Sequence, residues 1–563
     1  MKFFTLKYGR NEISIPILVV WLSFVAAGLL QAQTQVNTGT IDLGPTNLSI
    51  TNAAPITGVT ATNASPANPL ALSSPLPASS DASSLTVQKP TSPISPASIA
   101  NPGMGEDPVQ IPDWRILAAL MTIGSLAGFL LYQSGLTRAK NCGHSATLLV
   151  VGVIFGLVGY WMGGFAVQTG GVGDAHAALA ESIPSAGRSA LDHELGFTAR
   201  GHHWGIMGSS GFFLMTDETT SNGSSALFLN QAALLALALA AALGASLERA
   251  RVLAMAVFSF LIGVLIYPLL ANWVWGGGWL AELGREYGLG HGFVDLAGAG
   301  VVHETAGTIA LVIAIVLGPR AGRFDKDKKA IPGHHMPFVL LGASLLLISW
   351  TATNAFANED PMAMSTPVAG VAAVNTLLAA AAGLIVSFFL AGWQKRRPDP
   401  ALLCRGLLGG AVASCGCSAL IDPWAAFVIG GIAGLLVQGA FAFFEKRQID
   451  DPGGAAAIHG MGGAWGVLAT GFFANGTAGR GLNGVDGPVR GLFFGGAVHQ
   501  LIAQVIGMIT GFVVVFILGY ACLVLVQKIL GIRVPVADET EGLDWPQTGA
   551  LGYQGDADPD SKS

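Results

Sequence analysis

The sequence predicts an all-α integral membrane protein with eleven transmembrane helices. Of its 563 residues, 52% are hydrophobic and 11% are charged, a composition that is too apolar for an ordinary soluble domain. The apolar residues gather in runs of about 20, the length that crosses a bilayer. Lys and Arg residues fall mainly in alternate loops between these runs, as in multi-pass membrane proteins.

The N-terminal segment 1–32 has the pattern of a signal peptide. Lys2, Lys7 and Arg10 precede an apolar run over 15–30, and Gln31 and Ala32 follow it as a weak cleavage site. An uncleaved membrane anchor is the alternative interpretation. Either interpretation places the next residues outside the cytoplasm.

Residues 33–112 differ in composition from the rest of the chain. They are rich in Ser, Thr, Asn, Ala and Pro, with few charges and few aromatic residues. Such a segment buries too little apolar surface to offset the entropy lost on ordering. We therefore expect a disordered exported linker, followed by a membrane domain over 113–527 and a cytoplasmic tail over 528–563.

Eleven apolar segments make up the predicted membrane domain. They are expected at 114–134, 145–167, 226–247, 251–273, 296–318, 336–356, 368–393, 402–420, 424–444, 453–474 and 497–526.

The basic residues predict the orientation of these spans, because Lys and Arg collect in cytoplasmic loops. The loops after the odd-numbered spans hold Arg138, Lys140, Arg249, Arg251, Arg320, Arg323, Lys326, Lys328, Lys329, Lys395, Arg396, Arg397, Lys446, Arg447, Lys528 and Arg533. The other loops carry scattered arginines. We expect the N-terminus outside and the C-terminus in the cytoplasm, in an inner (cell) membrane of bacterial type.

A repeated spacing predicts two inverted five-helix repeats followed by a final helix. Asp295 precedes His303 by the same interval at which Asp451 precedes His459. Each Asp stands at a helix start, where a carboxylate accepts unpaired backbone N–H groups. Each His then lies about 12 Å deeper, since a helix rises about 1.5 Å per residue. Inverted repeats would bring the two imidazoles together near the midplane.

Simpler explanations exist for these side chains. Either histidine alone is equally explained by packing against a backbone carbonyl, but their matched spacing favours a paired site. A zinc-protease motif at His303-Glu304 fails because Gly307 stands where the second histidine is required.

We expect no metal, no cofactor and no nucleic-acid partner. Cys415 and Cys417 lie in a Gly/Ala-rich span, so helix packing explains them better than a metal pair. His202 and His203 lie in a Gly-rich outer loop, where surface histidines are the simpler interpretation. The net charge of -6 provides no basic surface for nucleic acid.

Several motifs together resemble the ammonium transporter (Amt/Mep/Rh) family over about 114–555. They are Leu136-Thr137-Arg138-Ala139-Lys140-Asn141, the run from Asn272 to Gly278, Asp295-Leu296-Ala297-Gly298 with Val301-Val302-His303, Asp450-Asp451-Pro452 with His459-Gly460, and Arg533-Val534-Pro535 with Glu541-Gly542-Leu543-Asp544. The long second outer loop and the stretch around His291 resemble a bacterial subgroup.

This resemblance implies a homotrimer that carries ammonium or ammonia through one pore per subunit. Trp275 would wall an outer recruitment site by cation–π contact; an interfacial aromatic anchor is the alternative role. Asp295 would mainly order the outer loop and add negative potential at the recruitment site, and direct binding of the substrate is its alternative role. His303 and His459 would share a proton, so that ammonia passes while alkali ions, which cannot shed a proton, are excluded.

The resemblance is incomplete at the outer gate. Trp350 and Asn354 match the family pattern on the sixth helix, but Thr353 and Leu234 stand where two gate phenylalanines are expected. Ala357 aligns with the serine of the recruitment site. Tyr132 falls near a family pore phenylalanine, and Phe129 or Phe356 are candidates to fill the vacated gate.

Three functions compete at this point. Transport of ammonium or methylammonium is the leading hypothesis, with electrogenic transport and a gas channel both open. An ammonium receptor or sensor with poor conduction is the alternative, motivated by the altered gate. A hydrolytic enzyme is disfavoured because no nucleophile and base are paired in the sequence. The tail predicts either a cytoplasmic partner of the PII signal-protein class or a brace between subunits.

Overall fold

The computed structural model describes residues 6–8, 11–13, 114–171, 191, 193–215, 221–325, 331–356 and 368–553. The chain divides into two compact units, and the helical unit covers Pro112–Ser563 together with Lys7–Ile13. Within 1–113 only β1 (Leu6–Tyr8) and β2 (Asn11–Ile13) are described, and they pair in a two-stranded sheet. The expected signal peptide therefore lies almost wholly outside the described residues, and the linker does so completely.

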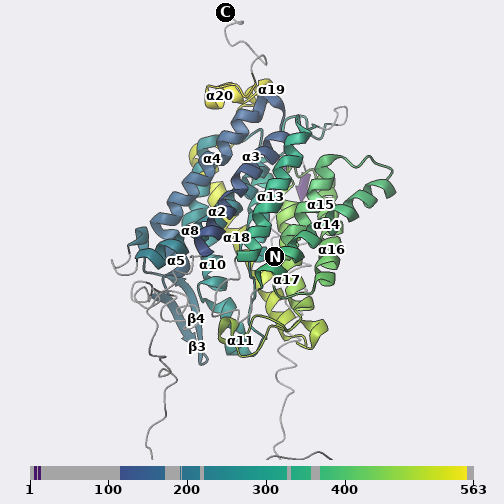
Figure 1. Cartoon of the computed structure of the whole chain (residues 1–563). Helices are drawn as coiled ribbons and strands as arrows, with labels where there is room; N and C mark the ends of the chain where they lie inside the picture. Colours follow the sequence, from purple (N-terminus) through teal and green to yellow (C-terminus); the bar gives the residue numbers. More distant parts are fainter. Residues whose placement is uncertain are drawn as a thin grey trace, which may run out of the picture. The chain divides into compact units, whose positions relative to one another are not determined.

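Helices dominate the described part of 114–553 (Figure 1). The first half holds α2 (Trp114–Ile123), α3 (Ser125–Leu136), α4 (Cys142–Gly159), α5 (Phe165–Thr169), α8 (Ser221–Leu243), α9 (Val252–Leu261), α10 (Tyr267–Trp275), α11 (Trp279–Tyr287) and α12 (Thr305–Leu317). The second half holds α13 (Met336–Phe356), α14 (Ala369–Trp393), α15 (Pro400–Ser414), α16 (Pro423–Lys446), α17 (Gly462–Phe473), α18 (His499–Leu530), α19 (Val536–Glu541) and α20 (Asp544–Thr548).

Four π-helical segments interrupt or open these helices. They are η2 (Tyr160–Gly164), η7 (Ile262–Ile266), η8 (Ala299–Glu304) and η9 (Ala456–Met461). Short 3₁₀ turns are η1 (Ala139–Asn141), η4 (Phe212–Leu214), η6 (Gly244–Ser246), η10 (Leu482–Gly484) and η11 (Leu492–Phe494). Because π-helical turns are rare and gather at functional sites, η8 and η9 mark the region to examine.

Among the described residues, nine helices are long and apolar enough to cross a membrane. They correspond to nine of the eleven predicted spans. The predicted eighth span is α15, a shorter apolar helix, and the predicted tenth is helical from η9 through α17 without being one of the nine. The prediction of a helical membrane protein is confirmed at this level, and the count of eleven stays a prediction.

The eighth helix ends six residues before its predicted boundary at 420, at Ser414. The following residues form turns, and their carbonyls point to neighbouring segments. Cys415 O accepts from Ala297 N at 2.9 Å, and Gly416 O accepts from Thr470 Oγ1 at 3.1 Å. These bonds satisfy backbone groups that a longer helix would have used internally.

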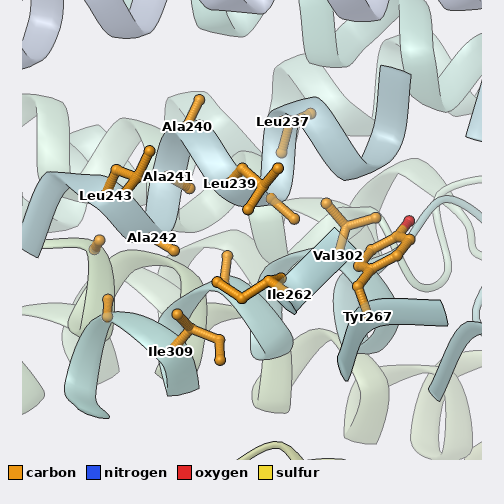
Figure 2. Packing of buried hydrophobic residues seen from close by; sticks show 14 of the residues in the cluster. Leu237, Leu239, Ala240, Ala241, Ala242, Leu243, Ile262, Tyr267, Val302 and Ile309 are labelled. Atoms are coloured by element: carbon orange, nitrogen blue, oxygen red, sulfur yellow. The ribbon is translucent and has the colours of Figure 1, made fainter. Parts of the chain in front are cut away.

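Small residues let the helices pack closely (Figure 2). The stretch of α8 from Leu235 to Leu243 is buried on every side, and it is built of Ala and Leu alone. Between α4 and η7, a Cβ on Gly263 would lie 2.0 Å from the carbonyl oxygen of Gly156. Such close backbone approach is the usual means of helix packing in membranes, where dispersion contacts replace the hydrophobic driving force.

Two groups of loops cap opposite ends of α4 and its continuation. The hairpin β3 (Glu194–Ala199) and β4 (His202–Gly208) packs against α5 and α10. The tail helix α20 packs at the start of α4, where His144 N donates to Asp544 Oδ1 at 2.8 Å. The tail thus lies at the end opposite to the hairpin (Figure 1).

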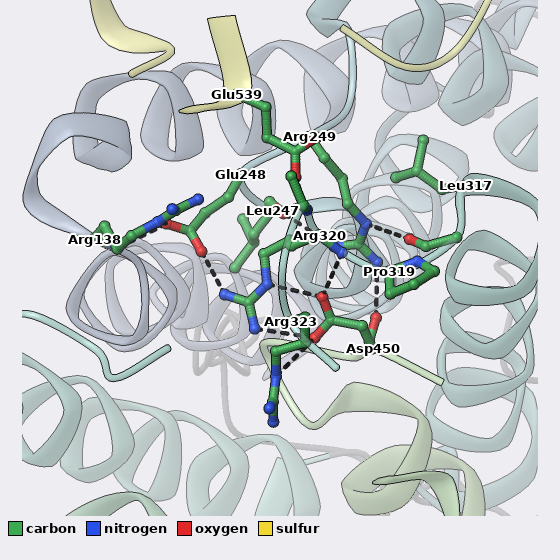
Figure 3. A network of polar contacts seen from close by, with 12 residues as sticks. Arg138, Leu247, Glu248, Arg249, Leu317, Pro319, Arg320, Arg323, Asp450 and Glu539 are labelled. Atoms are coloured by element: carbon green, nitrogen blue, oxygen red, sulfur yellow. Dashed lines mark hydrogen bonds and ion pairs between the residues drawn. The ribbon is translucent and has the colours of Figure 1, made fainter. Parts of the chain in front are cut away.

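The basic loops converge at the tail end on a network of ion pairs (Figure 3). Arg320 Nε and Nη2 donate to Asp450 Oδ2 and Oδ1 at 2.8 and 2.9 Å, and Arg320 also pairs with Glu248. Arg138 Nε donates to Glu248 Oε1 at 2.8 Å. Loops that follow the first, third, fifth and ninth predicted spans therefore meet at one end.

Glu248 is fully buried, and its burial and the neighbouring charges have opposite effects on its pKa. Burial alone would raise the pKa of the Glu248 carboxyl, but the guanidinium groups of Arg320 and Arg138 outweigh burial and hold this pKa at about 2. The tail joins the same network: Arg533 Nη2 donates to Glu539 Oε2 at 2.8 Å, and Leu543 N donates to Asn141 Oδ1 at 2.9 Å.

Candidate functional site

Asp295 organises the start of the segment that carries His303. Its Oδ1 accepts from the backbone N of Gly298 at 3.1 Å and of Ala299 at 2.7 Å. Its Oδ2 accepts from Gly300 N at 2.9 Å and Val301 N at 2.8 Å. Four otherwise unpaired donors at the helix start are thereby satisfied by one carboxylate, as the sequence predicts.

The turn before η8 also places Trp275. Gly298 has φ of 97°, which favours glycine because a side chain there is strained. A Cβ on Gly298 would lie 2.4 Å from a Val302 methyl and 3.3 Å from the Trp275 ring. Trp275 Nε1 donates to the carbonyl oxygen of Asp295 at 2.7 Å. The indole is thus fixed beside the entrance to η8.

The second half-site has a related but smaller arrangement around Asp451, whose Oδ1 has no hydrogen-bond partner among the described residues. Asp451 Oδ2 accepts from Ala456 N at 2.7 Å at the start of η9, which carries His459. Both histidines therefore lie in π-helical segments, each preceded by a buried aspartate. The widened π turn shifts the following side chains relative to an α-helix, a feature that the eight-residue spacing did not reveal.

The two histidines meet. His303 Nδ1 and His459 Nδ1 are 3.0 Å apart, and the rings are nearly parallel, with centroids separated by 5.1 Å and planes inclined by 21°. His303 is 1% exposed and His459 2% exposed. A hydrogen bond between two Nδ1 atoms needs one donor and one acceptor, so this geometry suits one proton shared by the two rings.

Aromatic rings wall the pair. The Trp350 ring stands edge-on to His303 at 5.1 Å and to His459 at 5.6 Å between centroids. The Phe129 ring lies 6.0 Å from His459 and 6.1 Å from Trp350. The Trp350 and Phe129 rings thus give the imidazoles apolar neighbours.

The predicted gate residues lie on two helices, α8 and α13. Thr353 of α13 is hydrogen-bonded to Thr122 of α2 through the two hydroxyl oxygens, 2.7 Å apart, and it also donates to Ser349 O at 2.9 Å. Leu234 of α8 is buried in the main apolar cluster. Asn354 Nδ2 donates to Thr376 Oγ1 at 2.9 Å.

Other predicted neighbours are only partly placed. Ala357, the expected recruitment position, lies outside the described residues. Tyr132 of α3 is buried in the main apolar cluster together with Phe129 and Trp350. Phe356, the other candidate to fill the gate, ends α13.

One contact that joins the half-sites escaped the sequence-based reasoning. A Cβ on Gly307 of α12 would lie 1.9 Å from Gly460 N, so the two backbones touch. Gly307 follows His303 by one helical turn, and Gly460 follows His459 directly. The sequence does show a glycine shortly after each histidine, Gly307 and Gly460, and this repeated feature could have indicated the contact.

The outer histidines contact acidic groups rather than each other. His202 Nδ1 lies 2.9 Å from Glu286 Oε2, and His203 Nε2 lies 3.2 Å from Glu194 Oε2. The Sγ atoms of Cys415 and Cys417 donate to helix carbonyls at 3.4 and 3.9 Å. These contacts agree with structural roles for all four residues.

Comparison with known proteins identifies the family of this chain. The Ammonium Transporter Family model matches residues 114–553. The ammonium transporter Amt2 of Archaeoglobus fulgidus is 32% identical over 446 residues, which cover 78% of this chain and 87% of the relative. An ammonium transporter of Bacillus subtilis is 35% identical over 315 residues, covering 55% of this chain and 71% of that protein.

Solved structures agree. A structure titled Sensor Amt Protein has a TM-score of 0.63 at 27% identity, covering 77% of this chain and 97% of the other. Mep2 of Saccharomyces cerevisiae shares the fold, with a TM-score of 0.61 at 24% identity over 75% of this chain and 86% of its own. These relatives are named as transporters or sensors and not as enzymes. The chain is a multi-pass membrane protein that belongs to the ammonium transporter family.

Proposed function

We propose that this protein transports ammonium across the membrane by separating the substrate from its proton at the His303–His459 pair. The observation that carries the proposal is the 3.0 Å contact between the two Nδ1 atoms inside an apolar enclosure. The two rings offer one shared proton between them and one Nε2 at each outer side. Such a chain can pass a proton along while a neutral molecule moves beside it.

The enclosure supplies selectivity. Moving a bare cation among Trp350, Phe129 and neutral imidazoles costs far more than moving ammonia, because few groups replace the lost hydration. Ammonium avoids this cost by releasing its proton, whereas potassium cannot. Deprotonation belongs at the outer end, where Trp275 presents an aromatic wall fixed by the Asp295 carbonyl.

Asp295 acts mainly through structure and field in this proposal. Its two oxygens are already engaged by four backbone N–H groups. It therefore holds the entrance of η8 and adds negative potential near the recruitment site. Direct ligation of ammonium by this carboxylate would require it to give up those bonds.

The proposed assembly has eleven helices in two inverted repeats plus α18, with the N-terminus outside and the tail in the cytoplasm of a bacterial-type inner membrane. Support comes from the paired Asp–His halves and from the basic loops meeting at the tail end. We further propose a homotrimer with one pore per subunit, as the resemblance to the family implies.

The test is ammonium-evoked current in vesicles that contain the purified protein, with potassium in the same buffer. We expect current with ammonium and none with potassium alone. Uptake of ammonia without current would indicate that the protein is a gas channel and does not relay a proton. No uptake at all, from correctly assembled protein, would contradict transport.

A sensor with poor conduction is the second candidate, and one observation favours it: the likeness to a structure titled Sensor Amt Protein. The altered gate positions Leu234 and Thr353 give it a physical basis. Tight ammonium binding without flux in the same vesicles would support sensing over transport.

A further inference from the structure

Glu304 is a carboxyl group within a membrane-spanning segment, next in sequence to His303. It lies in the span Ala299–Leu317 and is 4% exposed. Among the described residues, no Lys, Arg or His forms an ion pair with it. An unpaired ionised group is costly at this depth, and ionisable residues inside membranes generally mark pathways for protons or ions.

The Glu304 carboxyl lies near α18, whereas the neighbouring His303 side chain contacts His459 of η9. A Cβ on Gly511 of α18 would lie 3.9 Å from Glu304 Oε2 and 3.3 Å from a methyl of Leu270 on α10. Gly463 of α17 approaches the backbone, since a Cβ there would lie 2.7 Å from Glu304 N. The carboxyl therefore points toward α18 and α10, while the His303 ring points toward η9.

Among the described residues, no cation on the elements packed against η8 forms an ion pair with Glu304. Of those packed against it, α8, α12 and α17 carry no titratable side chain. The remaining ones bring His459 from η9, Tyr267 from α10, Cys404 and Arg405 from α15, and His499, Tyr520, Cys522 and Lys528 from α18. The charge that acts on Glu304 is that of Asp295, another acid.

One hydroxyl in this region also lacks a partner. Tyr267 is fully buried, and its hydroxyl has no hydrogen bond among the described residues. Tyr267 and Val302 of η8 lie in the same buried cluster (Figure 2). Within the described part of the chain, the Tyr267 hydroxyl and the Glu304 carboxyl thus both lack a protein partner near η8, so either group is available to bind a small ligand.

We propose that Glu304 is a proton-binding site within the membrane, coupled electrostatically to the proton on the His303–His459 pair. The coupling rests on the proposed function, whereas proton binding itself does not. With its proton bound, the carboxyl is neutral and its burial needs no counter-ion. When the proton leaves to bulk water, the carboxylate remains, and its charge favours an imidazolium on the pair.

A proton fits this place better than a metal or alkali ion. Such cations are held by several oxygen ligands, but Gly511 of α18, which faces Glu304 Oε2, and Leu270 beside Gly511 carry no side-chain oxygen. One carboxyl in an apolar setting binds a proton with its own two oxygens and needs no further ligands.

The experiment compares Glu304→Gln and Glu304→Asp with the parent in reconstituted vesicles. Glu282→Gln is the matched control, because Glu282 is a buried acid on another element, α11, where it pairs with Arg285 at 2.6 Å. Infrared spectra should show a protonated-carboxyl band in the parent that Glu304→Gln removes and Glu282→Gln keeps. A spectrum unchanged by Glu304→Gln would overturn proton binding.

Ammonium current across a pH series tests the coupling. Glu304→Gln mimics the protonated form, so it should equal the parent at acidic pH and fall about ten-fold below it at alkaline pH, the effect of one charge in a poorly screened setting. Glu304→Asp should restore the pH response. Identical pH profiles for the parent and Glu304→Gln would refute the coupling. If the parent carries no current, the proposed function fails, and the infrared band alone decides proton binding.

Discussion

Gly307 and Gly460 are in backbone contact, and this contact sets the separation of the two histidines. A Cβ on Gly307 would lie 1.9 Å from Gly460 N, whereas a Cβ on Gly460 would lie 3.5 Å from Gly307. The two positions are therefore unequal. Gly307 has no room for a methyl group, whereas a methyl group on Gly460 would make an ordinary van der Waals contact.

Gly307→Ala should push α12 away from η9 and weaken the Nδ1 contact between His303 and His459. We expect a loss of about 1–3 kcal/mol of stability, typical of overpacking, and at least ten-fold lower ammonium flux. Thermal unfolding and vesicle uptake measure both effects. Gly460→Ala is the matched control and should stay close to the parent; equal damage from both variants would contradict this account.

His303→Ala and His459→Ala should each abolish proton relay, because either change removes one of the two Nδ1 atoms. Ammonium current should fall by more than ten-fold or lose its selectivity over potassium. Size-exclusion chromatography controls for assembly. If both variants assemble normally and conduct like the parent, the histidine mechanism is wrong.

Glu248→Gln should destabilise the end of the protein that carries the tail. Removing this charge leaves Arg320 and Arg138 short of a partner, and breaking a buried ion pair costs about 3–5 kcal/mol. Thermal unfolding of the purified protein measures the loss. Glu445→Gln, at the more exposed pair with Arg323, should have a much smaller effect.

The same carboxyl predicts a pH dependence. The pKa of Glu248 in the folded protein is about 2, below its usual value of 4.5. Its contribution to stability is therefore complete above about pH 4.5 and is lost as the pH falls toward 2. The free energy of unfolding of the parent should therefore fall as the pH is lowered from about 4.5 to 2. In Glu248→Gln the free energy of unfolding should change less with pH over the same range.

Leu234→Phe combined with Thr353→Phe tests the altered gate. If the outer pore is open because two rings are missing, the double variant should improve selectivity for ammonium over larger amines and keep transport. Thr353 contacts Thr122 at 2.7 Å, so Thr353→Val serves as the control for losing that hydrogen bond alone. A complete block would mean that another side chain already fills the volume.

The tail offers two testable roles. Its contacts with Asn141, His144 and Ala321 brace loops of its own chain. Copurification with the host's PII protein under varied nucleotide conditions tests whether the same face also binds a partner. Consistent absence of binding would leave bracing as its role, and Asp544→Ala should then lower stability.

Much of this protein follows from local sequence. The apolar runs predicted helices at nearly every place where they occur, because about 20 apolar residues have few alternatives in a bilayer. The interval of eight residues from Asp295 to His303 recurs from Asp451 to His459. Because the same interval occurs once in each half of the membrane domain, it predicted a paired site.

Tertiary structure decided what depends on residues far apart in the chain. The π turns around both histidines, the early end of α15 at Ser414, and the backbone contact between Gly307 and Gly460 arise from packing between segments. The position of Glu304 against Gly511 is of the same kind. Sequence periodicity describes which residues are apolar, but it does not carry the distances at which separate helices meet.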